Sequence, residues 1–290
     1  MNKHIKGFIY ALAAAGISSI SIYYAKISVT KIDPIALAMY RNAWAGLLFL
    51  IPAVISLKAK KQTVPWLAAL SGSIPFALFF MGLKLVGALQ ANLIQKSMFL
   101  FASVLAFYFL KEKISKWMLG GYTIIILALS SSGIFSKLSF NGLILIFLAV
   151  LFWSAEQVYA RWQFKKKNVD TNVFGLVRML GGSILLFLFL HTSGKQSVMI
   201  LKEDQLAIVI IGGSLLFGYV SMWLKALSYA SVSVVTFVLT IATVFGIILQ
   251  FFLIGGKVVL PVDILYSAGI LALTPLCIHI VRTSVNYERV

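Results

Sequence analysis

The residues best able to do chemistry in this sequence are polar side chains that interrupt long apolar runs. Asn92, Gln95 and Lys96 lie in one such run with i, i+3 and i+4 spacing, so a helix places them on one face. In apolar surroundings that face points inward, where amide and ammonium groups provide donors for the carboxylate of a small organic molecule. The alternative is that these groups hydrogen-bond to neighbouring helices and hold a bundle together.

A further cation, Arg41, lies in a separate apolar run. If both runs cross a membrane, the rise of a helix places Arg41 about 10 Å and Lys96 about 12 Å from the same, outer side. Two cations at a similar depth with no carboxylate nearby repel each other, and an anionic group on a ligand would relieve that repulsion. The alternative is that the Arg41 side chain extends to the outer lipid headgroups.

Glu156 is the one acidic residue in the middle of an apolar run, and Arg178 lies at a similar depth in the next run. A short loop joins the two runs. We therefore predict an ion pair between Glu156 and Arg178, or a network that also includes Gln157. Such a pair either couples proton movement to a conformational change and gates a path, or joins two neighbouring helices statically.

Aromatic side chains near Glu156 are candidates for the wall of an organic-ligand cavity. Trp153 lies one helical turn before Glu156 on the same face, and Tyr159 follows on the same run. Both are predicted to contact the ligand. The alternative is the usual position of membrane aromatics, facing lipid or lying at the interface.

The composition places these residues in a membrane protein. The chain has 290 residues, of which 61% are hydrophobic and 11% charged, and its mean hydropathy is +0.98. Soluble domains have about 25% charged residues, so a soluble enzyme is excluded, and a chain this apolar is not disordered. No cofactor or metal site is expected, because the histidines and the single cysteine are scattered: His4, His191, His279 and Cys277.

Apolar runs of about 20 residues, long enough to cross the hydrocarbon core, predict ten transmembrane helices. They cover residues 6–25, 34–56, 65–83, 87–109, 116–135, 141–163, 172–191, 205–224, 228–254 and 262–282. Lys and Arg are roughly twice as frequent on the side that holds both termini, which predicts that both termini are cytoplasmic in a protein of the cell membrane. The net charge of +17 is explained by this asymmetry facing anionic lipids, so no nucleic acid is expected as a partner.

The sequence repeats itself with offsets that grow from 135 to 144 residues. The matching pairs are Gly7 with Gly142, Lys26 with Arg161, Asp33 with Asp170, Arg41 with Arg178, and Leu83 with Leu227. We therefore expect two repeats, residues 1–136 and 137–290. Each contains five spans, and an odd number makes the second copy enter from the opposite side, which predicts an inverted repeat.

The chain resembles the EamA type of the drug/metabolite transporter superfamily. The resemblance is carried by the two five-helix halves, by Asp33-Pro34 followed by Arg41, and by the end of the fourth span at Leu110-Lys111-Glu112-Lys113. The family often has a proline in the middle of the fourth helix and of its counterpart in the second half. Here those positions read Lys96-Ser97-Met98 and Ile241-Ala242-Thr243, and Gly256 stands in the second half where the first has Glu112.

The resemblance implies an all-α carrier of ten transmembrane helices and no enzyme activity. It implies a secondary transporter that moves a small organic metabolite across the bilayer by alternating access, with protons as a candidate coupling ion. An amino acid or related compound, exported, is the first substrate hypothesis. A passive facilitator or pore and, less favoured, a membrane-embedded enzyme are the alternatives. The sequence leaves the oligomeric state open.

Overall fold

The computed structural model describes residues 3–112, 123 and 139–253, and these residues form helices and connections without a strand. The α-helices of the first repeat are α1 (Lys3–Ser28), α2 (Pro34–Ala59), α3 (Ala68–Leu85), α4 (Ala88–Lys96) and α5 (Met98–Leu110). The second repeat contains α7 (Phe140–Lys166), α8 (Thr171–Leu176), the π-helix η2 (Val177–Gly181), α9 (Gly182–Thr192), the 3₁₀ helix η3 (Gln196–Met199), α10 (Glu203–Tyr229), α11 (Val232–Leu239) and α12 (Ala242–Leu253).

Within the described residues, 8 helical segments are long and apolar enough to cross a membrane. They correspond to the predicted spans one to four and six to nine, so the all-helical membrane architecture is confirmed for this part of the chain. The predicted spans 116–135 and 262–282, and with them Gly256, lie outside the described residues.

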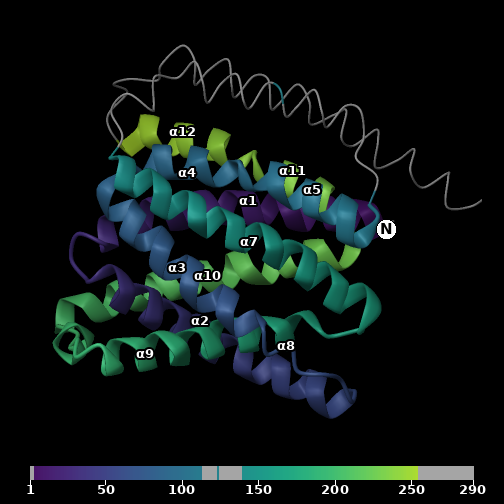
Figure 1. Ribbon diagram of the computed structural model, residues 1–290, viewed down its shortest axis with the longest axis horizontal. Helices are drawn as coiled ribbons and strands as arrows, with labels where there is room; N and C mark the ends of the chain where they lie inside the picture. The colour runs from purple at the N-terminus through teal and green to yellow at the C-terminus, as the bar shows by residue number, and fades with distance from the viewer. Residues whose placement is uncertain (1–2, 113–122, 124–138, 254–290) are drawn as a thin grey trace, which may run out of the picture.

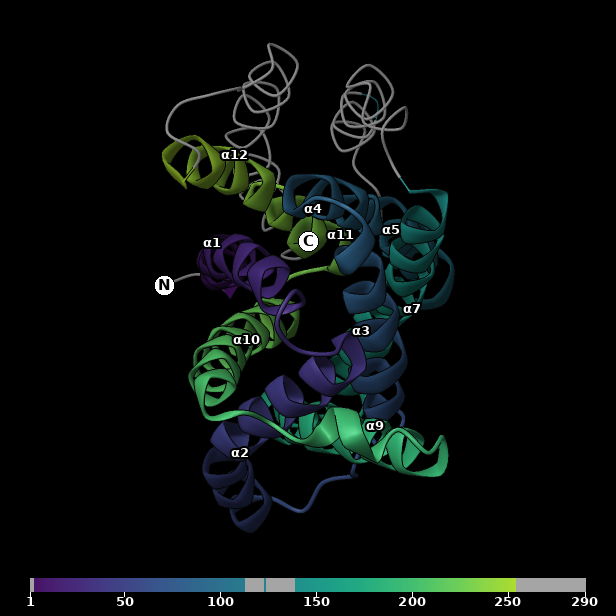
Figure 2. The same cartoon turned by 90° about the vertical axis from the view of Figure 1, so that its left-hand side faces the viewer.

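The helices lie in three layers. Figures 1 and 2 both show α4, α5, α11 and α12 on one side of the bundle and α2 and α9 on the opposite side. Between them lie α1, α3, α7 and α10, so the middle layer takes two helices from each repeat.

Equivalent basic side chains of the two repeats bond to the C-terminal ends of equivalent helices. Lys26 at the end of α1 donates to the backbone oxygen of Leu83 at 2.8 Å. Arg161 near the end of α7 donates to the backbone oxygen of Leu227 at 2.7 Å. The last carbonyls of a helix lack intrahelical partners. Lys26 bonds such carbonyls at the end of α3, and Arg161 bonds those at the end of α10. The predicted correspondence of Lys26 with Arg161 and Leu83 with Leu227 is therefore confirmed as one contact made twice.

Two glycines show that the repeats run in opposite directions. A Cβ on Gly7, at the start of α1, would lie 2.7 Å from the Cβ of Ala230, and one on Gly142, at the start of α7, would lie 2.8 Å from Val86. The end of α10 thus contacts the start of α1 and the end of α7. The end of α3 makes the reverse contacts, with the end of α1 and the start of α7. This antiparallel relation of α1 and α7 is the arrangement expected of an inverted repeat.

The two aspartates of the repeated motif are helix caps. The Asp33 carboxylate accepts from the backbone N–H of Ile35 at 2.9 Å, and the Asp170 carboxylate accepts from that of Asn172 at 2.8 Å. Each begins a helix, α2 or α8. The spacing of eight residues then places Arg41 and Arg178 about 12 Å farther along the helix, within the bundle.

The fourth helix of each repeat is broken at a similar position, although neither break contains a proline. The chain tightens into i→i+3 hydrogen bonds at Ser97 and again at Thr240. The Ser97 hydroxyl bonds the carbonyl of Ile94 at 2.8 Å, and the Thr240 hydroxyl bonds that of Phe237 at 2.6 Å. Hydroxyl groups that bond back to the preceding turn bend helices, so they explain breaks where the family often has a proline.

Candidate functional site

A cavity of about 40 Å³ lies between the two repeats, within the middle of the bundle. Its polar wall from the first repeat is formed by Ser18, Ser21, Arg41 and Gln95, and that from the second by Glu156, Gln157, Arg178 and Tyr219. Its aromatic wall is formed by Phe76, Phe79, Phe80, Trp153 and Trp223. This volume admits a few water molecules, so the side chains surround a small cavity.

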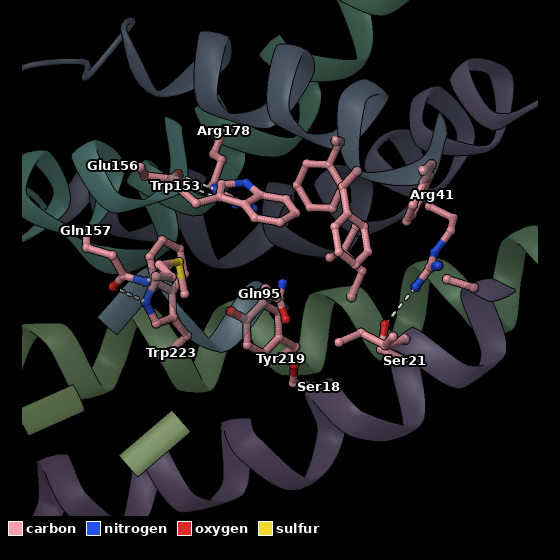
Figure 3. A pocket seen from close by; sticks show the side chains of 17 residues that line it. Ser18, Ser21, Arg41, Gln95, Trp153, Glu156, Gln157, Arg178, Tyr219 and Trp223 are labelled. Carbon is pink, nitrogen blue, oxygen red and sulfur yellow. Dashed lines mark hydrogen bonds and ion pairs between the residues drawn. The ribbon is translucent and has the colours of Figure 1, made fainter. Parts of the chain in front are cut away.

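An ion pair between Glu156 and Arg178 occupies one end of this group of side chains (Figure 3). Arg178 Nε donates to Glu156 Oε1, and Arg178 Nη2 donates to Glu156 Oε2 at 3.0 Å. Ser71 also donates to Glu156 Oε1, at 2.6 Å. Both charged side chains are buried, with 4% and 2% of their surfaces exposed. The predicted contact between Glu156 and Arg178 is confirmed, and its bidentate form gives the carboxylate a fixed orientation.

The backbone around Arg178 is a π-helix, Val177–Gly181. It is packed against α3 at Gly72, where an added Cβ would collide with the backbone oxygen of Arg178. The Asn42 side chain donates to the Gly72 oxygen at the same crossing. A π-turn displaces the residues that follow it and is frequent at functional sites. The position of Arg178 therefore depends on a backbone irregularity and a close approach to α3.

Aromatic rings surround the Arg178 guanidinium. Its central carbon lies 5.1 Å from the ring centroids of both Phe76 and Trp223, within the range of a cation–π interaction. Trp223 Nε1 in turn donates to Gln157 Oε1 at 2.7 Å. Among the described residues Gln157 therefore bonds neither Glu156 nor Arg178, and it approaches the predicted pair only through the Trp223 ring.

Arg41, at the opposite end of the group in Figure 3, has a different environment. Its Nη2 donates to the Ser21 hydroxyl at 2.7 Å, and its guanidinium carbon lies 5.2 Å from the Phe80 ring centroid. Its Nε and Nη1 have no hydrogen-bond partner, and no ion pair is formed with a carboxylate among the described residues. Only 1% of Arg41 is exposed. The alternative that it extends to the lipid headgroups is therefore wrong.

Helix α10 approaches Arg41 through two glycines. An added Cβ on Gly212 would lie 2.9 Å from Arg41 Nε, and one on Gly213 would lie 3.0 Å from the Arg41 backbone oxygen. The close crossing of α2 and α10 resembles the close crossing of η2 and α3 at Gly72. Arg41 and Arg178 each lie where a glycine allows a neighbouring helix to approach closely.

Gln95 and Trp153 complete the predicted part of the wall. Gln95, the penultimate residue of α4, lines the cavity next to the break at Ser97. The Trp153 ring lies 5.3 Å from that of Phe76 and 5.2 Å from that of Phe79, and its buried Nε1 has no hydrogen-bond partner among the described residues. Both residues thus present hydrogen-bonding groups beside an aromatic surface.

Comparison with known proteins assigns the fold to a family. The family model of the EamA-like transporter family matches residues 5–132 and 140–274, one match for each repeat. The chain belongs to the EamA-like transporter family. A protein of known crystal structure has the same fold, with a TM-score of 0.72 over 97% of this chain and 98% of that one, at 18% identity. No curated protein matches the chain.

Two of the predicted substrate-binding residues of this EamA-like transporter, Asn92 and Lys96, do not line the cavity. Asn92 is buried but donates to the backbone oxygen of Ala242, at 3.4 Å, where α12 begins. Lys96 is buried at the end of α4, and its Nζ donates to Gln95 Oε1 at 3.4 Å. One helix face can contact two neighbours, and here Gln95 faces the cavity while Asn92 faces α12. The expectation that Lys96 and Arg41 share one site is corrected accordingly.

Tyr159 also lies away from this cavity. It lines a surface depression with Leu105 and Phe109, its hydroxyl accepts from Gln163 at 2.7 Å, and its ring lies 5.8 Å from that of Phe174. Tyr159 is six residues beyond Trp153, which turns its side chain to another part of the α7 surface. The predicted contact of Tyr159 with the ligand is therefore not supported.

Ser18 and Ser21 were missed by sequence reasoning. Serines in an apolar helix resemble ordinary packing positions, but the repeat offset of 135 assigns Ser18 to Trp153 and Ser21 to Glu156. Both equivalents line the same EamA-like cavity. The alignment of the two halves was the signal that could have identified them.

Proposed function

We propose that this protein is a secondary transporter that moves a small organic metabolite by alternating access. The observation that carries the proposal is the cavity enclosed jointly by the two repeats, with polar groups from each. Substrate sites of carriers built from inverted repeats lie at the repeat boundary. The substrate hypothesis is an amino acid or a related carboxylate, exported across the cytoplasmic membrane, with both termini in the cytoplasm.

In this proposal Arg41, Gln95 and Trp153 bind the substrate. Arg41 and Trp153 have donors that find no partner in the part of the chain that the structure describes, and Gln95 adds an amide. The aromatic wall contacts the apolar part of the substrate. Glu156 and Arg178 couple or gate the movement, because a pair buried between the repeats has its geometry changed when the repeats move.

The broken helices supply a place for that movement. The segments of the two breaks pack crosswise, α4 against α12 and α5 against α11. Gln95 and Met98 flank the first break and line the cavity. A rotation at Ser97 and Thr240 would therefore enlarge the small cavity on one side of the bilayer, with little change within each helix.

A counterflow experiment tests this function. A thermal-shift screen of amino acids, amines, nucleotide sugars and purine metabolites first selects ligands of the purified protein. Proteoliposomes loaded with an excess of unlabelled ligand should then accumulate labelled ligand transiently, since a carrier exchanges one for the other. A pore gives only equilibration, and that result, or no flux, would contradict the carrier.

Ser18→Trp, which fills the cavity, should abolish counterflow, whereas Ile51→Ala on the exposed surface of α2 is the control.

The coupling role of Glu156 has a separate test. Glu156→Gln keeps the shape of the side chain but cannot gain or lose a proton. We expect it to retain counterflow while losing accumulation driven by a pH gradient. Accumulation that still follows the pH gradient in this variant would remove Glu156 from proton coupling and leave the pair with a structural role.

A further inference from the structure

The cavity wall has an excess of hydrogen-bond donors. Among the described buried side-chain atoms without a partner, those on this wall are Arg41 Nε, Arg41 Nη1 and Trp153 Nε1. All three are N–H groups that cannot accept a hydrogen bond. A ligand that satisfies them must bring acceptor oxygens, as a carboxylate does.

The wall also carries one uncompensated positive charge. Its charged residues are Arg41, Glu156 and Arg178, and the last two neutralise each other in a bidentate pair. Arg41 bonds the Ser21 hydroxyl, whereas its counterpart Arg178 bonds the Glu156 carboxylate. A buried charge without a counterion is costly, and a bound anion removes that cost.

The carboxylate and amide oxygens on the wall already accept hydrogen bonds. The Glu156 oxygens accept from Arg178 and Ser71, the Gln157 oxygen accepts from Trp223, and the Gln95 oxygen accepts from Lys96. An ammonium group would have to compete with these bonds. A zwitterion would therefore satisfy the donors with its carboxylate but would bring a cation into a cavity that is already positive.

We infer that the substrate of the proposed transport is a small organic monoanion whose carboxylate binds Arg41, and that the cavity binds this anion in preference to the corresponding zwitterion. The inference rests on the proposed function and specifies its substrate class. The anionic end lies toward Arg41, and the apolar end lies against the Phe79 and Phe80 rings, which line the same wall. Among amino acids and their relatives, the 2-oxo acid binds more tightly than the amino acid with the same side chain.

Matched ligand pairs test the preference in the purified full-length protein. The probes are phenylpyruvate with phenylalanine, and pyruvate with alanine, compared by thermal stabilisation and by titration calorimetry. At least one anion should bind, and should bind at least about tenfold more tightly than its amino acid, the effect of one charge-assisted interaction. Equal or tighter binding of the amino acids, or binding by neither anion, would overturn the inference.

Substitution of Arg41 locates the site. Arg41→Gln should weaken binding of the anion by at least about tenfold, whereas Arg41→Lys should retain part of it because the charge remains. Lys195→Gln removes the same charge from an exposed loop and is the matched control, with unchanged binding expected. Anion binding that is the same in Arg41→Gln as in the wild type would overturn the assignment.

A second variant tests the inference without removing Arg41. Ser21→Glu places a carboxylate beside Arg41, at the position equivalent to that of Glu156 beside Arg178. This internal anion should occupy Arg41 and abolish anion stabilisation, while Ser21→Gln, of the same size, should retain it. Retained anion binding in a folded Ser21→Glu protein would contradict the inference.

Transport separates this inference from the proposed function. If amino acids show counterflow that Arg41→Gln leaves unchanged, the protein is a carrier and the anion inference fails. If anions bind in an Arg41-dependent way but neither they nor amino acids show counterflow, the anion site stands and the proposed transport fails.

Discussion

Arg41 and Arg178 occupy equivalent positions in the two repeats and have opposite electrostatic environments. Each lies eight residues after an aspartate that caps its helix, and each lies at a glycine-mediated helix crossing. Arg178 forms a bidentate ion pair with Glu156, whereas Arg41 bonds Ser21 and keeps two nitrogens that have no partner within residues 3–112 and 139–253.

The difference separates two uses of one scaffold. A buried cation with its carboxylate is electrically complete and orients its neighbours, whereas one without it remains able to bind an external anion. Because the offset of 135 assigns Ser21 to Glu156, one side-chain difference accounts for the change. The half with the complete pair suits gating, and the half whose arginine has no carboxylate partner among the described residues suits ligand binding.

The largest expected effect is a difference in protein stability between substitutions of the two arginines. Arg178→Gln leaves the Glu156 carboxylate buried and unpaired, which should lower the free energy of unfolding by about 3–5 kcal/mol. Arg41→Gln leaves no carboxylate unpaired and should change stability by about 1 kcal/mol or less. Thermal unfolding in detergent measures both. Combining Arg178→Gln with Glu156→Gln should restore most of the loss, and equal losses for the two single variants would refute the contrast.

The helix crossings provide the next comparison. Gly72→Ala places a methyl group against the backbone oxygen of Arg178, which cannot rotate away, so α3 and the π-helix must separate. Gly213→Ala meets the Trp44 Cβ at 2.7 Å and the Arg41 backbone oxygen at 3.0 Å, both longer approaches than that at Gly72. We expect Gly72→Ala to cost about 1–3 kcal/mol from overpacking, and Gly213→Ala to cost less. The same thermal unfolding assay measures both, and a larger loss for Gly213→Ala would show that the α2–α10 crossing is the less adaptable one.

Sequence patterns predicted contacts best where the repeat made them occur twice. The Asp33 to Arg41 spacing recurs at Asp170, and both aspartates are helix caps. The Glu156–Arg178 contact was predictable because a mid-span acid and a base in the next span have few alternatives in a membrane. Hydropathy likewise identified the 8 membrane-capable helices within the described residues.

The sequence could not separate side chains that lie on one helix face but contact different neighbours. Asn92 and Gln95 are three residues apart, yet one bonds α12 and the other lines the cavity. The choice depends on how the two broken helices cross, which local periodicity does not specify. The breaks themselves were equally difficult to predict, because Ser97 and Thr240 bend the helices through hydroxyl bonds to the backbone.

The repeated contacts at the helix ends allow a smaller test. Lys26→Gln removes a cation that bonds the backbone oxygens of Leu83 and Lys84. Arg161→Gln removes one that bonds the equivalent carbonyls and also lies 3.6 Å from the Glu112 carboxylate. Both should destabilise the protein, with Arg161→Gln costing about 1 kcal/mol more because it also removes an ion pair that is partly shielded from solvent. Equal melting temperatures for the two variants would show that the Glu112 contact adds nothing.

The smallest expected effect is a pH dependence at Glu112, just beyond the fourth span. Burial raises the pKa of this carboxyl, and this effect outweighs Arg161 and the Val232 backbone N–H, which lower it. The folded protein therefore holds the proton more tightly than the unfolded chain. Its stability should fall as the pH rises from the ordinary glutamate pKa of 4.5 through the raised pKa of Glu112.

Melting temperatures across this pH range for the wild type and Glu112→Gln isolate the Glu112 contribution, because every other titrating group is common to both proteins. The decline with pH should be shallower in Glu112→Gln. It should be steeper in Arg161→Gln, since loss of the cation raises the pKa of Glu112 further. Parallel profiles for all three proteins would mean that Arg161 acts at this end through the Leu227 and Ser228 carbonyls alone, as Lys26 does through its carbonyls at the opposite end.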